Sequence, residues 1–206
     1  MDPLPTLAVT LSSDGGITTE DIGFGRVAPH WTVKMIVTYL ETSKTAQQRP
    51  ITFQTPNTHD MSTFRLRYLF NNAWKDAGYG PGCMLGMYLG GPTTSQINVA
   101  YSGGRFTSLA PGESWEKSVP IFEFEWLCPE EGVNVEIVGD AFTLQYTGGV
   151  VGWWDYGGRE EHRETTVTVD WMRRIVSPKD SGGRQEEVVF QASNVLEAPW
   201  DKLRVN

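Results

Sequence analysis

Period-two alternation of apolar and polar residues is the feature that most constrains what this chain can fold into. Leu7, Val9 and Leu11 alternate with small or polar residues, and residues 31–39 repeat the pattern over a longer run. Successive side chains of a β-strand point to opposite faces, so this spacing gives each segment one apolar face. The same kind of argument predicts strands at residues 51–53, 64–70, 84–89, 97–101, 115–122, 133–138, 142–146, 165–171 and 188–190.

Turn signals separate these segments at short intervals. Examples are Asp14-Gly15-Gly16, Ser102-Gly103-Gly104 and Ala110-Pro111-Gly112. The 22 glycines and 12 prolines are spread along the chain and mark no linker, and helix is expected only for a turn or two at residues 71–77. We therefore predict an all-β protein, a single domain over residues 1–206 with flexible ends, built as a two-sheet, mainly antiparallel sandwich with little helix.

Charge and composition exclude several classes of partner. The formal net charge is −8, from 25 acidic and 17 basic residues, which opposes binding to nucleic acid or to an anionic membrane surface. The opening residues carry no signal-peptide pattern, and no apolar run reaches the roughly 20 residues of a membrane helix. We expect a cytoplasmic protein in which Cys83 and Cys128 are unpaired thiols.

A family resemblance rests on two short stretches. They are Leu109-Ala110-Pro111-Gly112-Glu113-Ser114, which leads into a strand, and residues 139–146, GDAFTLQY. Over about the middle half of the chain, this pattern resembles immunoglobulin-like sandwich domains. It is most similar to the β-rich accessory region of fungal deuterolysin-type proteins and to stand-alone fungal proteins of that kind. The resemblance implies a fold and no protease activity, because no HExxH zinc motif is present.

The segment 140–164 holds the residues most suggestive of chemistry. Glycines frame Trp153, Trp154 and Tyr156, and an acidic stretch around His162 follows. If residues 160–164 are extended, Glu160, His162 and Glu164 share one face and could ligate a metal or transfer a proton. The alternative is a solvated outer face that leads into the next strand. Asp155 and His162 are the candidate catalytic groups, and we expect neither a metal nor another cofactor.

Aromatic and methionine side chains are the candidate ligand-binding residues. Aromatic residues make up 12% of the chain, and several lie next to glycine rather than within alternating strands. They line either an apolar ligand pocket or the packed core and its corners. Neighbouring Trp residues on a strand face opposite ways, so we expect one of the pair 153/154 to pack inward and the other to stay available to a ligand. The candidates are Trp74, Met87, Tyr88, Trp126, Trp153, Trp154 and Tyr156.

Two functions from different classes fit these features. The first is binding of a hydrophobic small molecule, such as a terpenoid or polyketide. It includes the possibility of a cofactor-free cyclase or isomerase of fungal secondary metabolism that acts by confining its substrate. The second is a non-catalytic immunoglobulin-like module that binds or inhibits another protein through loops or a sheet edge. A deep apolar pocket favours the first function, and a flat aromatic patch with a polar rim favours the second.

Overall fold

The computed structural model describes residues 4–21, 27–40, 49–58, 61–76, 94–121, 141–170, 175–176, 182–184 and 186–199. Within these ranges the regular structure is strand, apart from two short 3-10 helices, η1 (Met61–Thr63) and η3 (Arg159–His162). None of the helices in these ranges is long and apolar enough to cross a membrane. The prediction of a β protein with little helix is confirmed for this part of the chain.

The largest sheet contains the strands that the alternation predicted most clearly. Its order is β10 (Ser114–Pro120), β4 (Thr32–Leu40), β1 (Thr6–Ser12), β15 (Val189–Phe190) and β12 (Gly149–Val150). All its pairings are antiparallel except that of β1 with β15. The apolar faces coincide because the register places the buried residues Leu7, Val9 and Leu11 directly opposite Tyr39, Val37 and Met35.

A four-stranded antiparallel sheet has the order β16 (Leu196–Pro199), β11 (Ala141–Tyr146), β6 (Phe64–Phe70) and β7 (Ala73–Asp76). The expected helix at residues 71–77 is wrong for the described residues, because residues 71–76 form a turn and a strand. Asn71 and Asn72 have φ of 50° and 59°. Asn tolerates this left-handed region better than most residues, and two such residues close a tight β-hairpin.

Three smaller sheets complete the described structure. One has the order β13 (Trp154–Tyr156), β5 (Ile51–Gln54) and β9 (Phe106–Leu109). The other two pair β14 (Thr166–Val169) with β8 (Ser95–Asn98), and β2 (Thr18–Asp21) with β3 (Val27–His30). The strands predicted at 84–89 and 133–138 lie outside the described residues.

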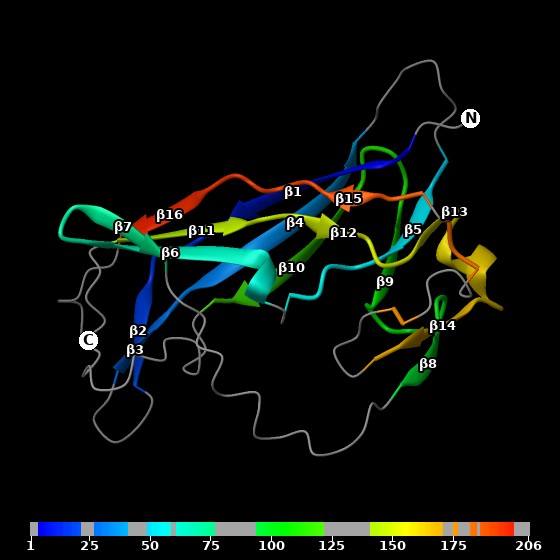
Figure 1. Cartoon of the computed structure of the whole chain (residues 1–206), viewed down its shortest axis with the longest axis horizontal. Coiled ribbons are helices and arrows are strands. Elements are labelled where there is room, and N and C mark those ends of the chain that lie inside the picture. The colour runs from blue at the N-terminus through cyan, green and yellow to red at the C-terminus, as the bar shows by residue number, and fades with distance from the viewer. Residues whose placement is uncertain are drawn as a thin grey trace.

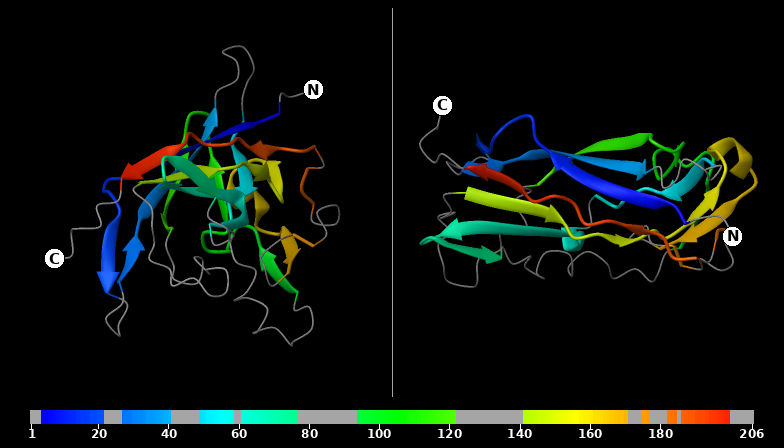
Figure 2. Two further views of the ribbon diagram at one scale, coloured as in Figure 1. Left: turned by 60° about the vertical axis from the view of Figure 1, so that its left-hand side comes forward. Right: turned by 90° about the horizontal axis from the view of Figure 1, so that it is seen from above.

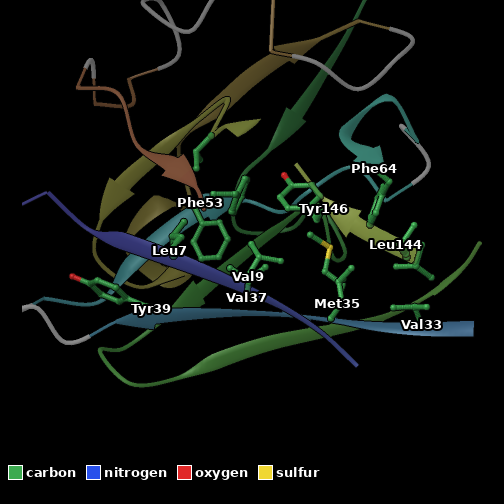
Figure 3. Packing of buried hydrophobic residues seen from close by; sticks show 14 of the residues in the cluster. Leu7, Val9, Val33, Met35, Val37, Tyr39, Phe53, Phe64, Leu144 and Tyr146 are labelled. Atoms are coloured by element: carbon green, nitrogen blue, oxygen red, sulfur yellow. The ribbon is translucent and has the colours of Figure 1, made fainter. Parts of the chain in front are cut away.

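The main core lies inside the curve of the large sheet. Viewed from above, that sheet curls from β4 on one side of the molecule towards β15 and β12, with β6 and β7 on the opposite side (Figure 2, right). Side chains from β1, β4, β5, β6 and β11 meet in the space between, and Phe53, Leu144 and Tyr146 lie among those of β1 and β4 (Figure 3). The two-sheet, immunoglobulin-like sandwich is not confirmed, since the described strands fall into five sheets.

Candidate functional site

Trp154 lies in the main core. It belongs to β13, which pairs with β5 so that Trp154 is opposite Phe53 and Tyr156 is opposite Ile51. The indole is 2% exposed and packs edge-on against the Tyr156 ring, with 5.4 Å between ring centroids. Its Nε1 donates a hydrogen bond of 2.8 Å to the carbonyl of Glu186. This buried indole therefore has both apolar packing and a polar partner, as buried Trp side chains usually require.

Trp153 points the other way, into a second and smaller hydrophobic cluster. The cluster consists of Val99, Phe106, Trp153, Val167 and Val169. Trp153 is also 2% exposed, and its ring meets the Phe106 ring edge-on at 5.4 Å between centroids. The two indoles do face opposite ways, and both are buried, so neither lies open at the surface; that one of them is available to a ligand stays a prediction. The second cluster buries the Trp153 side of the strand, which the local alternation of side chains did not predict.

The acidic segment after Tyr156 is helical rather than extended. Gly157 has φ of +106° and turns the chain into η3, whose first turn is held by a 2.7 Å hydrogen bond from the Gly158 N–H to the Glu161 carboxylate. The extended segment that would have aligned Glu160, His162 and Glu164 on one strand face is therefore not formed. Glu160 instead pairs with Arg163 at the surface, while His162 turns inward.

His162 is the most unusual polar group of the site. The residue is 7% exposed, and its ring lies perpendicular to that of Trp153 with 5.4 Å between centroids. Among the described residues its buried Nε2 has no hydrogen-bond partner. Leaving such a group unpaired costs about 1–3 kcal/mol, so a buried unpaired nitrogen in a native structure calls for an explanation.

Arg159 presents a second unpaired nitrogen on the same 3-10 turn. Its Nη2 donates to the carbonyl of Ala100, which ties η3 to the loop after β8. Its Nε is buried and, like that of His162, has no partner in the described part of the chain. The helix η3 also contacts β9, the strand that supplies Phe106 to the second cluster. One turn thus places two unsatisfied nitrogen groups close to an aromatic cluster.

Asp155 is engaged in a different interaction. Its Oδ1 accepts a hydrogen bond of 2.8 Å from the Tyr156 N–H and one of 3.2 Å from Arg184 Nε. The Arg184 guanidinium lies 4.6 Å from the centroid of the Tyr156 ring, and that of Arg49 lies 5.5 Å from it. Asp155 therefore positions the Arg184 guanidinium over the Tyr156 ring, at the end of β13.

Tyr156 is also close to a phenol of the large sheet. Burial raises the pKa of Tyr39, and the charge interaction with Tyr156 raises it further. Two phenols that approach each other in a buried place disfavour a phenolate on either one. The Tyr39 phenol is therefore neutral at physiological pH, and both rings belong to the main core.

Of the remaining sequence-predicted candidates, Trp74 is the one within the described residues, and it does not join this site. Trp74 lies on β7, at the opposite end of the molecule from β13 (Figure 1), and is 40% exposed. Met87, Tyr88 and Trp126 lie outside the described residues, as do Cys83 and Cys128. Within the described ranges, no group of three or more His, Cys, Asp or Glu side chains is placed to hold a metal ion.

Arg159, Phe106 and Arg184 were missed as site residues by the sequence reasoning. Arg159 lies beside the acidic stretch and carried no signal of its own, since charged residues next to glycines are common in exposed turns. Arg184 reaches Asp155 from 29 positions further along the chain. Comparison of the chain with protein-family models, curated proteins and solved structures gave no match.

Proposed function

We propose that the protein binds a mainly apolar small molecule, terpenoid- or polyketide-like, beside His162 and Trp153. The observation that carries the proposal is the buried Nε2 of His162 without a hydrogen-bond partner among the described residues. A ligand with one carbonyl or hydroxyl group would pair with this nitrogen, and its carbon skeleton would contact the aromatic rings. The ligand would thus remove the cost of an unsatisfied polar group in an apolar setting.

The imidazole can serve such a ligand in two ways. A neutral ring with its proton on Nε2 donates to a ligand carbonyl, and the other tautomer accepts from a ligand hydroxyl. The same group, packed edge-on against Trp153, can remove a proton from one ligand carbon and return it to another. Cofactor-independent isomerisation or cyclisation is the catalytic form of this proposal, with His162 as acid and base and with substrate confinement lowering the entropic barrier.

The immunoglobulin-like fold family is also part of this proposal. We propose a relationship to immunoglobulin-like domains, and the mainly antiparallel pairing of the sheets around the main core is the feature in its favour. The narrower resemblance to fungal deuterolysin-type accessory regions, and with it a role in fungal secondary metabolism, stays a prediction. This resemblance would place the protein among β-sheet proteins whose activity comes from the residues of a local site and not from the fold itself.

The test uses two probes that differ by one oxygen. Carvone is a terpenoid ketone, and limonene has the same carbon skeleton without the carbonyl. In a titration followed by Trp fluorescence, we expect carvone to bind the protein at least tenfold more tightly than limonene, about 1.4 kcal/mol. The substitution His162→Phe keeps an aromatic ring but removes both nitrogens, so it should abolish the preference.

The matched control is His30→Phe, because His30 is only partly buried and its Nε2 bonds to Thr32 Oγ1 at 3.1 Å. This variant should keep the preference for carvone. Native mass spectrometry of the purified protein should in addition detect a retained small molecule that the His162→Phe protein lacks. Equal binding of the two terpenes, or binding of neither together with an empty mass spectrum, would overturn the proposal.

A second candidate function is a non-catalytic module that binds another protein. The specific observation in its favour is the edge strand β7, all four residues of which are exposed. Exposed sheet edges pair readily with an extended chain, and most proteins cover or shorten them.

A further inference from the structure

We propose that the outer edge of β7 binds an extended, acidic segment of a partner protein as an added β-strand. This inference rests on the second candidate function and is independent of the His162 site. The β7 strand is the last strand of its sheet and pairs only with β6 among the described strands (Figure 1). Addition of a strand to such an edge is a common mode of peptide recognition.

The register shows which backbone groups face the partner. In a hairpin with a two-residue turn, the pair next to the turn exchanges its backbone hydrogen bonds, and this pair is Phe70 with Ala73. Hydrogen-bonded and non-hydrogen-bonded pairs then alternate, so Trp74 is in a non-hydrogen-bonded pair, as is Asp76. The N–H and C=O groups of Trp74 and Asp76 therefore point away from β6, towards the open edge.

The side chains of the same two residues form one surface with β6. Period-two alternation and the register place Trp74 beside Leu69 and Asp76 beside Arg67, all on the outer face. Trp74 is 40% exposed, and it is a large aromatic anchor of the kind that dominates binding energy at interfaces. A strand bonded to the edge would have apolar side chains within reach of this indole.

Charge selects an acidic partner. Residues 64–76 contain three basic residues and one acidic residue, a net charge of +2 in a chain of −8. Asp76 accepts hydrogen bonds from Arg65 Nε at 3.0 Å and from Arg67 Nε at 2.9 Å. One carboxylate is thus shared by two guanidinium groups. Arg67 contacts this carboxylate through Nε, and its terminal nitrogens have no hydrogen-bond partner among the described residues, so they can bind a carboxylate of the added strand.

The same charges argue against a second copy of this chain on the edge. Two hairpins placed side by side would each bring a charge of +2 to the contact, and like charges across an interface are unfavourable. Lys75 in the middle of the short edge acts in the same direction, since a lysine on an edge strand disfavours pairing with an identical strand. An acidic segment of a different protein would carry the opposite charge and would not place a second lysine beside Lys75.

The experiment uses two threonine-based heptapeptides with valine at position 2 and a charged residue at position 4, aspartate in one peptide and lysine in the other. These two positions share one face of an extended strand, so valine can reach Trp74 while the charged residue reaches Arg67. Chemical-shift titration of the isotope-labelled full-length protein should show the aspartate peptide binding at least tenfold more tightly. The amides of Trp74 and Asp76 should become protected from hydrogen exchange. Trp74→Ala should weaken binding at least tenfold, Arg67→Gln should reduce the preference for aspartate, and Lys117→Gln on β10 should change neither.

Several outcomes would overturn the inference. They are equal binding of the two peptides, binding that Trp74→Ala leaves unchanged, no binding of either peptide at millimolar concentration, and a dimer in sedimentation that Trp74→Ala dissociates. The carvone preference is measured on the same protein and does not involve β7. A loss of peptide binding with that preference intact contradicts only the strand docking, and the reverse result contradicts only the small-molecule site.

Discussion

Trp153 and Trp154 are adjacent in the chain, yet their indoles lie in two different hydrophobic clusters, each 2% exposed. Trp154 packs among residues of the main core, and Trp153 packs against Phe106 and the strands β8 and β14. The backbone between them thus joins the two clusters. His162 lies against Trp153, so the candidate site belongs to the smaller cluster.

Both indoles should therefore be needed for stability. Replacement of a large buried aromatic side chain by alanine removes its packing and leaves a cavity, so we expect Trp153→Ala and Trp154→Ala each to lower the free energy of unfolding by about 3–5 kcal/mol. Trp74→Ala, at an exposed position, should change it by no more than about 0.5 kcal/mol. Urea unfolding measures all three. A nearly unchanged Trp153→Ala protein would mean that the second cluster contributes little to the fold.

His162→Phe should stabilise the fold while it removes the proposed ligand preference. The wild-type ring keeps a buried nitrogen without a partner among the described residues, and a phenyl ring of similar shape carries no such group. We expect the free energy of unfolding of the ligand-free protein to rise by about 1 kcal/mol, a gain of the kind seen where function has constrained a residue. A loss of stability in thermal unfolding would show that His162 makes a favourable interaction in the folded state.

The hairpin turn offers a local test of backbone conformation. Asn72 has φ of 59°, a region that glycine enters without steric cost, and Asn-Gly is the preferred pair in tight hairpins of this kind. Asn72→Gly should raise the free energy of unfolding by about 0.5 kcal/mol, whereas Asn72→Val should lower it by about 1 kcal/mol or more. Equal effects of the two substitutions in urea unfolding would contradict the turn geometry.

Asp76 should make stability depend on acid pH. Hydrogen bonds from Arg65 and then Arg67 lower the pKa of its carboxyl group to about 2. Because the folded pKa lies below the unfolded value near 3.8, the stabilisation is present above pH 4 and is lost as the pH falls towards 2. The group is exposed, so the effect is small and screened by salt. Asp76→Asn should flatten the melting temperature between pH 4 and pH 2 relative to wild type; an unchanged pH profile would contradict the pairing.

Strand positions were predictable where alternation was long and regular. β1 and β4 follow their apolar periods, and β11 matches the predicted segment closely. β9 was missed because only the first and last of its four residues are buried, so the segment shows no alternation. The turn at residues 159–162 was also misjudged, because a short charged segment satisfies its local hydrogen bonds as readily in a 3-10 turn as in a strand.

The sequence by itself determined that Trp153 and Trp154 face opposite ways, since alternation is a property of the local backbone. Only the tertiary structure decided what lies on each face. Val99, Phe106 and Val167, brought together from three separate segments, bury the side that would otherwise be open. The same packing encloses His162 without giving its Nε2 a partner among the described residues. Burial depends on contacts between residues far apart in the chain, and a local pattern contains no information about which distant segment will cover it.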